Sequence, residues 1–587
     1  MKLLSLGPIN VNQKVRELKL QNISHRSDQF KQLHKELKLK IKKFTNASEI
    51  YEVMFIPGSG TSGIEAMISS FQGKSLMVCS NGSFGDKWQL IASLYDINVV
   101  KYSNGWGIPF DNSEISRVSK KLGINNIMIV HHETSINIIN NLEGFDSDIN
   151  LIVDMVSSFG IESINLENSN ILMCSFSSNK GSCSYPGISV VIGKIDYLKE
   201  VNLKIPFYLN LKNYYTYSLL EQTPTTPNVS ILQYFNRSLD SLENGITSEK
   251  LDYITNSFEI LGIYEIPISK NMKSKGINTY YYPLGINPID FYNYCFNNNF
   301  CIYNYTKGYL LNKAFQISVM GDISIDDVKN FIKIVKKFPN LKKSNSPKLP
   351  IIVLVAGMGT RMKNKFNVPK CLIEIKGITI LERQFINVSK CKQFINKLIL
   401  VIGFQKELIM EEALKLSLKY SMDVEFVENT DYAITNTCKS VLKVKNESGY
   451  YLIDGDLVFD NNILESMCVF PQSCCAVSRN NPLHNQVNDH EAVCVYESNN
   501  VVTRIGKKLD NGVGESIGLY KLTKELILDC KINEMLELSE PNHYYEDSFQ
   551  LAITKGYNFN MTVMDFTGYD SVEVDTIDDY NLITKLI

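Results

Sequence analysis

Short apolar runs that stop at polar turns recur along this chain, and they predict its secondary structure. Residues 351–355 (IIVLV) and 151–153 (LIV) contain only β-branched residues and leucine. Such uninterrupted runs are typical of parallel strands that are covered on both faces. A third run, 450–453 (YYLI), ends in carboxylates. Because glycine turns and a helix start also follow an apolar stretch near residue 57, the sequence predicts an α/β fold.

The pattern breaks clearly at residues 336–350 (KKFPNLKKSNSPKLP), where Pro, Ser, Asn and Lys replace periodic apolar positions. Such a composition is typical of a linker. The 587 residues leave room for about four units of ~150 residues. We therefore predict one part over residues 1–340, a linker over 341–349 and a second part over 350–587.

Composition limits the partners and the cellular setting. A net charge of −2 gives no basic excess for nucleic acid, so none is expected as a partner. The start MKLLSLGPIN is too short for a signal segment, and no run of 18 apolar residues occurs. We therefore expect no membrane partner and a cytoplasmic protein. The 13 cysteines form no CxxC pair, which favours reduced thiols over a zinc site.

The stretch after the strand at 351–355 has the composition of a triphosphate-binding loop. Gly357 and Gly359 allow the backbone to turn tightly and bring N–H groups against phosphate oxygens. Arg361 and Lys370 supply positive charge. The stretch lacks the GxxxxGK[ST] and GxGxxG spacings, so neither a P-loop kinase nor a dehydrogenase is the first interpretation.

Two acidic pairs are candidate ligands for Mg²⁺, which prefers hard oxygen ligands. Asp454 and Asp456 end the apolar run at 450–453, where strand ends in an α/β sheet face the ligand crevice. Glu573 and Asp575 alternate along VEVD and so share one face of a predicted strand. Taken alone, each carboxylate is more often a solvated residue at the end of a strand than a metal ligand. Together with the neighbouring triphosphate-binding loop, a metal ligand becomes the favoured interpretation.

From about residue 349 to the end, the chain resembles nucleotidyltransferases that charge sugar 1-phosphates, phosphocholine or phosphonates. Their A-G-x-G-[ST]-R motif followed by P-K is matched at residues 356–361 and 369–370. The resemblance implies a Rossmann-like, GT-A-like domain with Mg²⁺ on Asp456 and Asp575. It implies nucleotide contacts at Val355, Ala356, Gly357, Gly359, Thr360, Arg361, Lys370, Asn436, Thr437 and Ser440, and acceptor contacts at Glu515, Tyr545, Glu546 and Asp547.

The first part of the chain carries the residues of a pyridoxal phosphate site. Ser59 and Thr61, in a strand–glycine turn–helix stretch, can hold a phosphate. Asp154 ends a buried strand, and Lys180 follows 180 − 154 = 26 residues later, about one strand–helix–strand step. Pyridoxal phosphate (PLP) enzymes need a carboxylate for the pyridine nitrogen and an amine that binds the cofactor covalently.

Residues 1–340 resemble class V aminotransferases of PLP fold type I, and within them the 2-aminoethylphosphonate:pyruvate transaminases. The matches include GSGTSGIEAM (58–67), VDMVSSFG (153–160) and SSNK (177–180). The resemblance implies a large and a small lobe, the small one at about 230–340, and a homodimer. It implies cofactor contacts at Ser59, Gly60, Thr61, Phe84, Thr134, Asp154 and Lys180, and at Thr223 and Thr226 toward a neighbouring subunit.

One position departs from that family. The family writes Phe-Arg-Ile-Gly near the end of this domain, and its Arg binds the acidic end of the substrate. Here Gln316 stands in place of the Arg. Glutamine donates hydrogen bonds but carries no charge. Either another cation such as Arg26 binds the acid, or amine transfer is weak.

The two parts fit one pathway. An aminotransferase using alanine and releasing pyruvate would make 2-aminoethylphosphonate, and a cytidylyltransferase would join it to CMP from CTP. The whole chain resembles the bifunctional phosphonate transaminase–cytidylyltransferases, with Lys180, Asp154, Lys370 and Arg361 as the catalytic residues. The alternative is a phosphocholine or sugar-phosphate nucleotidyltransferase whose aminotransferase part serves another amine or is only a dimerising scaffold.

Overall fold

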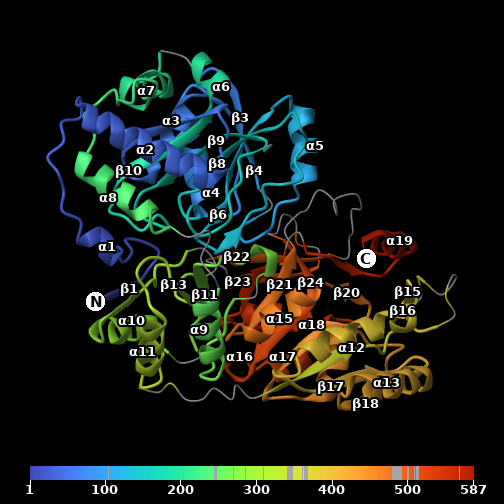
Figure 1. The fold of residues 1–587 in the computed structure, drawn as a ribbon. Helices are drawn as coiled ribbons and strands as arrows, with labels where there is room; N and C mark the ends of the chain where they lie inside the picture. The colour runs from blue at the N-terminus through green and yellow to red at the C-terminus, as the bar shows by residue number, and fades with distance from the viewer. Residues whose placement is uncertain are drawn as a thin grey trace. The chain divides into compact units, whose positions relative to one another are not determined.

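A computed structural model gives the fold of the chain (Figure 1). It describes residues 1–587 except 104, 168, 202–203, 243–247, 267, 269, 284–285, 308–309, 340, 342–347, 360, 363–365, 367, 479–491, 499–500, 508, 510–513, 567–568 and 587. The chain divides into two compact units, Met1–Lys342 and Lys343–Ile587. Among the described helices, none has the length and apolar character that crossing a bilayer requires.

The first unit is built on a sheet whose seven described strands run in the order β2-β10-β9-β8-β5-β3-β4. Strands β9, β8, β5, β3 and β4 pair in parallel, and β10 pairs antiparallel with both β2 and β9. The strands are β1 (Lys2–Leu4), β2 (Tyr51–Gly58), β3 (Ser75–Cys79), β4 (Asn98–Tyr102), β5 (Asn126–Val130), β6 (His132–Glu133), β7 (Ile138–Ile139), β8 (Asn150–Asp154), β9 (Ile171–Ser177), β10 (Gly187–Lys194), β11 (Ile277–Tyr281), β12 (Phe300–Ile302) and β13 (Ala314–Ser318).

Helices cover both faces of this sheet, because alternate strand residues are apolar on both sides. On β2, Val53 and Phe55 pack with one set of helices, α2 and α8, whereas Met54 and Ile56 pack with another, α3 and α4. The helices are α1 (Gln13–Arg16), α2 (Asp28–Thr45), α3 (Gly60–Ser69), α4 (Ser83–Ala92), α5 (Asn112–Leu122), α6 (Ile195–Glu200), α7 (Leu211–Ser218), α8 (Val229–Leu239), α9 (Glu249–Glu259), α10 (Pro288–Asn297) and α11 (Ile325–Val335).

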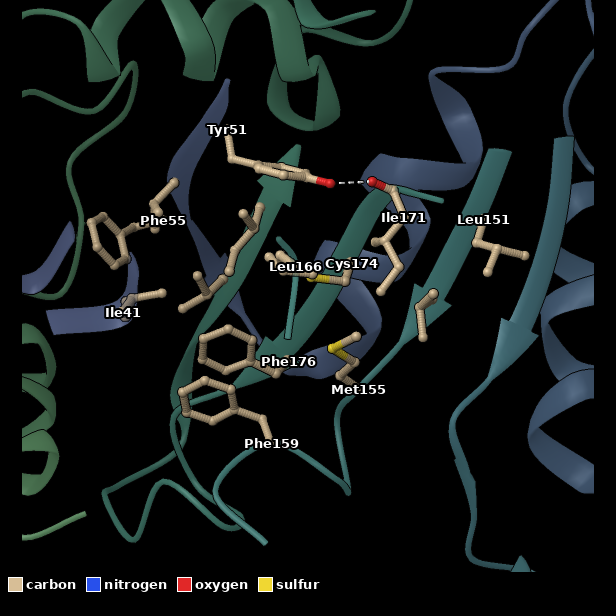
Figure 2. Packing of buried hydrophobic residues seen from close by; sticks show 14 of the residues in the cluster. Ile41, Tyr51, Phe55, Leu151, Met155, Phe159, Leu166, Ile171, Cys174 and Phe176 are labelled. Atoms are coloured by element: carbon tan, nitrogen blue, oxygen red, sulfur yellow. Dashed lines mark hydrogen bonds between the residues drawn. The ribbon is translucent and has the colours of Figure 1, made fainter. Parts of the chain in front are cut away.

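Figure 2 shows the core on the α2 side of the sheet. The rings of Phe159 and Phe176 stack with centroids 3.5 Å apart, and the hydroxyl of Tyr51 donates to the carbonyl oxygen of Ile171 at 2.7 Å. The hydroxyl is thus satisfied although the ring is buried. A separate core joins β11–β13 to helices α9–α11, so the later part of this unit has its own packing centre.

The second unit contains a mixed sheet whose described strands run in the order β18-β17-β14-β19-β24-β21-β25-β23-β22. The predicted strand at 351–355 is β14, which pairs in parallel with β17 and β19. The strands are β14 (Leu349–Leu354), β15 (Glu374–Ile375), β16 (Ile378–Thr379), β17 (Ile395–Ile402), β18 (Val424–Glu428), β19 (Gly449–Asp454), β20 (Leu457–Phe459), β21 (Cys474–Ser478), β22 (Val493–Ser498), β23 (Val501–Lys507), β24 (Gly514–Thr523), β25 (Thr562–Asp565) and β26 (Ser571–Glu573).

Several helices of this unit pack on the sheet through apolar side chains. The described helices of the unit are α12 (Ile380–Lys390), α13 (Lys406–Tyr420), α14 (Thr437–Val444), α15 (Asn461–Val469), α16 (Lys524–Asp529), α17 (Ile532–Leu538), α18 (Tyr545–Thr554) and α19 (Ile577–Leu586). Leu354 of β14 lies in register with Asp454 of β19. The carboxyl ends of both strands therefore meet at one edge of the sheet, where ligands bind in open α/β sheets.

Candidate functional site

A cavity of about 480 Å³ in the first unit contains the predicted Lys180. Lys180 follows β9, and its Nζ donates a hydrogen bond to the hydroxyl of Ser157 at 2.8 Å. The same Nζ lies 5.9 Å from the ring centroid of Phe84, which also lines the cavity. Burial lowers the pKa of Lys180, and the charges of Asp154 and Glu133 partly offset this effect. The cavity thus presents an amine that loses its proton more readily than a lysine in water does.

Asp154 lies buried at the carboxyl end of β8, as the sequence predicts. The indole N–H of Trp88 donates to its Oδ2 and the N–H of Val156 donates to its Oδ1, each at 2.8 Å. Burial raises the pKa of Asp154, whereas these hydrogen bonds and the nearby Lys180 lower it. The carboxylate is therefore held in one orientation by donors from two elements.

The predicted phosphate-binding residues Ser59, Gly60 and Thr61 begin helix α3. A Cβ on Gly60 would lie 2.7 Å from the side chain of Val156, so the helix start packs directly beside the end of β8. The ammonium of Lys87 donates to the hydroxyl of Thr61 at 3.0 Å. Backbone N–H groups at a helix start and a lysine favour an anion there. Lys87 was not among the predicted site residues, although its spacing of three from Phe84 places both on one side of α4.

Glu133 is a second buried acid that sequence reasoning missed. Its carboxylate accepts the backbone N–H groups of Phe84 and Gly85 at 3.0 and 3.1 Å, and the hydroxyl of Ser135 donates to it at 2.6 Å. Burial raises its pKa. These contacts fix the start of α4 and so set the position of the Phe84 ring in the cavity.

Gln316, on β13, lines the same cavity and is fully buried. Its Nε2 donates to the carbonyl oxygen of Thr134 at 2.8 Å and to the hydroxyl of Thr279 at 3.0 Å. Both N–H groups are thereby used inside the protein, and Oε1 has no hydrogen-bond partner among the described residues. Thr134, predicted to approach the cofactor, lines the cavity and supplies one of these acceptors.

The cation suggested as a substitute for an arginine at position 316 does not line this cavity. Arg26 donates to the side chain of Gln222 and to the carbonyl oxygen of Thr223. The hydroxyl of Thr223 donates to the carbonyl oxygen of Thr225, and Thr226 is exposed. The contacts of Thr223 and Thr226 with a second subunit stay a prediction. Lys307 is instead the charged residue that lines the cavity together with Lys180 in the described part of this unit.

The second unit has its own cavity of about 400 Å³, at the edge where β14 and β19 end. It brings together many of the residues that the nucleotidyltransferase resemblance implies: Ala356, Gly357, Gly359, Arg361, Lys370, Asn436, Thr437, Ser440, Asp456, Glu515, Tyr545, Glu546 and Asp575. Val355, the residue after β14, is buried and does not line the cavity. Thr360 lies outside the described residues.

Lys370 and two aspartates form the centre of this cavity. The ammonium of Lys370 donates to Asp456 Oδ2 at 2.9 Å and also to Asp575 Oδ1, and Arg361 pairs with Asp575 Oδ2 at 3.2 Å. Burial opposes the charge on Lys370, but the two carboxylates outweigh it and raise the pKa. A Cβ on Gly359, where φ is +54°, would lie 2.7 Å from the Lys370 side chain. The glycine therefore provides both the turn and the space for the lysine.

Strand pairing explains why Asp456 and Asp575 meet although they lie far apart in the sequence. Leu457 of β20 is in antiparallel register with Glu573 of β26, and the N–H of Val574 donates to the carbonyl oxygen of Asp456. Both aspartates thus flank one two-stranded ladder. Among the described residues, no set of three or more His, Cys, Asp or Glu is arranged to hold a metal, and a lysine ammonium joins the two aspartates instead.

Six carboxylates and three basic side chains line this cavity, so formal negative charge exceeds positive charge there. Asp454 and Glu573, which the sequence offered as further candidate ligands for Mg²⁺, also line it, as does Glu546. Asp547 was expected on the acceptor side, but it does not line the cavity. Its carboxylate accepts the backbone N–H of Tyr544 at 2.8 Å and caps helix α18.

Comparison with known proteins assigns a family to part of the chain. The model of the family "Aminotransferase class-V" matches residues 11–250. A 2-aminoethylphosphonate–pyruvate transaminase of Lysinibacillus sphaericus is 24% identical over 59% of this chain and 99% of its own length. An uncharacterized aminotransferase of Methanocaldococcus jannaschii is 28% identical over 51% of this chain and 82% of its own.

Solved structures agree on the fold. An alanine–glyoxylate aminotransferase from Nostoc superposes with a TM-score of 0.53 at 21% identity, over 57% of this chain and 94% of its own. Residues 11–250 therefore match the class V aminotransferase family, and the N-terminal part of the chain has the α/β architecture that its sequence predicts. For that part the prediction of fold class is confirmed.

Proposed function

We propose that this chain is a bifunctional enzyme of phosphonate synthesis, with one reaction in each unit. The first unit transfers an amino group from alanine to phosphonoacetaldehyde and gives 2-aminoethylphosphonate and pyruvate. The second unit joins that product to CMP from CTP. Similarity to 2-aminoethylphosphonate transaminases supports the first reaction, and the group formed by Lys370, Asp456 and Asp575 supports the second.

The residues of the first unit fit pyridoxal phosphate. Asp154, buried and held by two donors, would pair with the pyridine nitrogen, and Phe84 would lie against the ring. The start of α3 with Lys87 would hold the phosphate. When bound, the cofactor supplies an electron sink for cleavage of the substrate Cα–H bond. Lys180, whose pKa burial lowers, is positioned to bind the cofactor covalently and to carry the proton at its Nζ.

The residues of the second unit fit a magnesium nucleotide. Asp456 and Asp575 converge on one cation, so they would hold Mg²⁺ once Lys370 turned toward the triphosphate. When bound, the metal neutralises charge on phosphate oxygens. Arg361, Lys370 and the N–H groups near Gly357 would stabilise the remaining charge. A phosphonate oxygen attacks the α-phosphorus of CTP, a new P–O bond forms, and the bond to the β-phosphate breaks to release pyrophosphate. Because the phosphonate is anionic at neutral pH, no general base is required.

A single incubation tests the second reaction. The full chain is mixed with Mg²⁺ and CTP, ATP or GTP, against 2-aminoethylphosphonate, phosphocholine and a sugar 1-phosphate, and pyrophosphate release is measured. We expect release with CTP and 2-aminoethylphosphonate. Release with phosphocholine or a sugar phosphate alone would favour the alternative function, in which the first unit serves another amine or only as a scaffold. The neutral Gln316 is the observation that favours this alternative.

Lys307 is expected to bind the acidic end of the amine-transfer substrate, because Gln316 has no charge and Arg26 does not line the cavity. Replacing Lys307 by glutamine should raise the KM for 2-aminoethylphosphonate. A charge-assisted hydrogen bond is worth roughly 1.5–3 kcal/mol, and solvent screening reduces this at an exposed lysine, so we expect about a threefold to tenfold rise.

Steady-state kinetics of amine transfer measure this effect, and kcat should change little. Lys199→Gln, which removes a surface lysine of α6 with 57% side-chain exposure, is the matched control. An unchanged KM in Lys307→Gln would show that another group binds the acid.

A further inference from the structure

Gln316 lies on β13 with its backbone held on both sides, so the direction of its side chain is fixed. It is the antiparallel partner of Thr279 on β11, and on its other side it exchanges two backbone hydrogen bonds with Tyr303, at 2.7 and 3.0 Å. Its neighbours Phe315 and Ile317 belong to the apolar core of α9–α11. Because side chains alternate along a strand, Gln316 points to the opposite face, where it lines the cavity of the first unit.

The donors of the Gln316 amide are both used by the protein itself. Its Nε2 donates to the carbonyl oxygen of Thr134 at 2.8 Å and to the hydroxyl of Thr279 at 3.0 Å. A carbonyl oxygen can only accept, so the contact with Thr134 requires the N–H side of the amide. An acidic substrate group would have to break one of these hydrogen bonds and leave a buried acceptor unpaired. Gln316 is therefore poorly placed to bind such a group.

Thr134 lies in the turn of a short hairpin whose arms are β6 and β7. At the end of this turn Asn137 has a φ of +60°, and its Nδ2 donates to the carbonyl oxygen of Ile277 on β11 at 3.0 Å. Gln316 and Asn137 thus attach the turn to the two paired strands β13 and β11. A turn attached at two points keeps less conformational freedom than one attached at a single point.

The same hairpin also holds the start of helix α4. Glu133, on β6, accepts two backbone N–H groups of the first turn of α4, at 3.0 and 3.1 Å. The hydroxyl of Ser135 accepts a third, from Ser83, at 2.9 Å. Phe84, in this first turn, lines the cavity together with Thr134. A displacement of the hairpin would therefore move two of the predicted cofactor contacts at once.

We propose that Gln316 is a positioning residue that holds the β6–β7 hairpin, and with it Thr134 and the start of α4, in the geometry that binds the cofactor, and that it does not bind the acidic group of the substrate. The position that the family resemblance assigns to substrate binding has thus changed its role in this chain. The inference rests on the proposed pyridoxal phosphate site of the first unit. It leaves the acidic group to another residue, for which Lys307 is the candidate.

Gln316→Met tests this role on the full chain, because methionine has a similar length and no N–H donor. Pyridoxal phosphate is titrated into cofactor-free protein and followed by its visible absorption. We expect it to bind about twofold to tenfold more weakly to the variant, the range for one lost hydrogen bond. Once saturated with cofactor, the variant should keep the wild-type KM for 2-aminoethylphosphonate. A raised KM with unchanged cofactor binding would place Gln316 in the substrate site and overturn the proposal.

Thr279→Val is the matched control. Thr279 is buried like Gln316, and valine keeps its shape. The change removes the second acceptor of the Gln316 amide and leaves the hydrogen bond to Thr134 in place. Both variants should lower the thermal stability of the cofactor-free protein, but Thr279→Val should bind pyridoxal phosphate like wild type. If the two variants lose the same cofactor affinity, Gln316 contributes only to packing and the proposal fails.

Hydrogen exchange of the cofactor-free protein separates this proposal from the proposed function. We expect the backbone amides of residues 132–139 to exchange faster in Gln316→Met than in wild type or Thr279→Val, because the hairpin has lost one of its two attachments. If wild-type protein takes up no pyridoxal phosphate, the proposed reaction of the first unit is wrong, and this exchange decides the role of Gln316. Faster exchange in Gln316→Met alone supports it. Equal exchange in all three proteins refutes it.

Discussion

Replacing Lys180 by alanine is expected to abolish amine transfer and leave nucleotidyl transfer unchanged. Lys180 lines the cavity together with Phe84 and Gln316, and burial lowers the pKa of its amine. Removing a positioned proton-transfer group costs about 10²–10⁴-fold, and loss of the covalent link to the cofactor adds to this. Alanine cannot restore either role.

Two measurements check this expectation on the full chain. Amine transfer from alanine is followed as pyruvate formation, and the visible absorption of protein-bound cofactor is recorded in parallel. Lys199→Ala, at an exposed position on α6, should retain both signals. Wild-type protein that neither contains nor takes up pyridoxal phosphate would remove the premise, and substantial activity in Lys180→Ala would assign the amine to another lysine.

Replacing Asp575 by asparagine is expected to reduce nucleotidyl transfer by about two orders of magnitude or more and to leave amine transfer intact. Asp575 contacts both Lys370 and Arg361. Asp456 also contacts Lys370, so the two carboxylates converge on one cation. Asparagine keeps the size and loses the charge that attracts Mg²⁺. Asp456→Asn should behave in the same way.

Pyrophosphate release with CTP measures the loss, and titration with Mn²⁺ provides a readout that does not depend on turnover. Mn²⁺ should bind more weakly to Asp575→Asn than to the wild-type protein. Asp578→Asn, an exposed aspartate on α19, is the matched control and should bind the ion like wild type. If a folded Asp575→Asn protein lost both activities, the two reactions would not belong to separate units.

The parts of the molecule that sequence reasoning located are those that local chemistry determines. The strand at 351–355, the glycine turn after it and the acid at the end of the 151–153 run follow from apolar runs and from residues that allow tight turns. Asp154 is the first charged residue after the apolar run at 151–153, and it ends β8. Such features depend on a few consecutive residues, so they can be predicted without the fold.

The same reasoning could not tell whether an acidic residue binds a ligand or caps a helix. It also could not tell whether a basic residue is available for a substrate or is already hydrogen-bonded within the protein. Asp547 looks like an acceptor residue in YYED, but its carboxylate caps α18. Arg26 looked available for a substrate acid, yet it bonds to Gln222 and Thr223. Both outcomes depend on where a helix begins and on which loop lies opposite, and neither is encoded within a few residues of the side chain.

By itself the sequence determined which residues are candidates for the chemistry of this protein: an amine and a buried acid in the first unit, and a glycine loop with basic residues in the second. Only the tertiary structure decided which of them meet. Asp456 and Asp575 both bind Lys370 because β20 pairs with β26. Gln316 donates its N–H groups to Thr134 and Thr279 because β13 passes beside these two residues. Register between distant strands results from the packing of the whole sheet, because one shifted residue would turn every side chain to the other face.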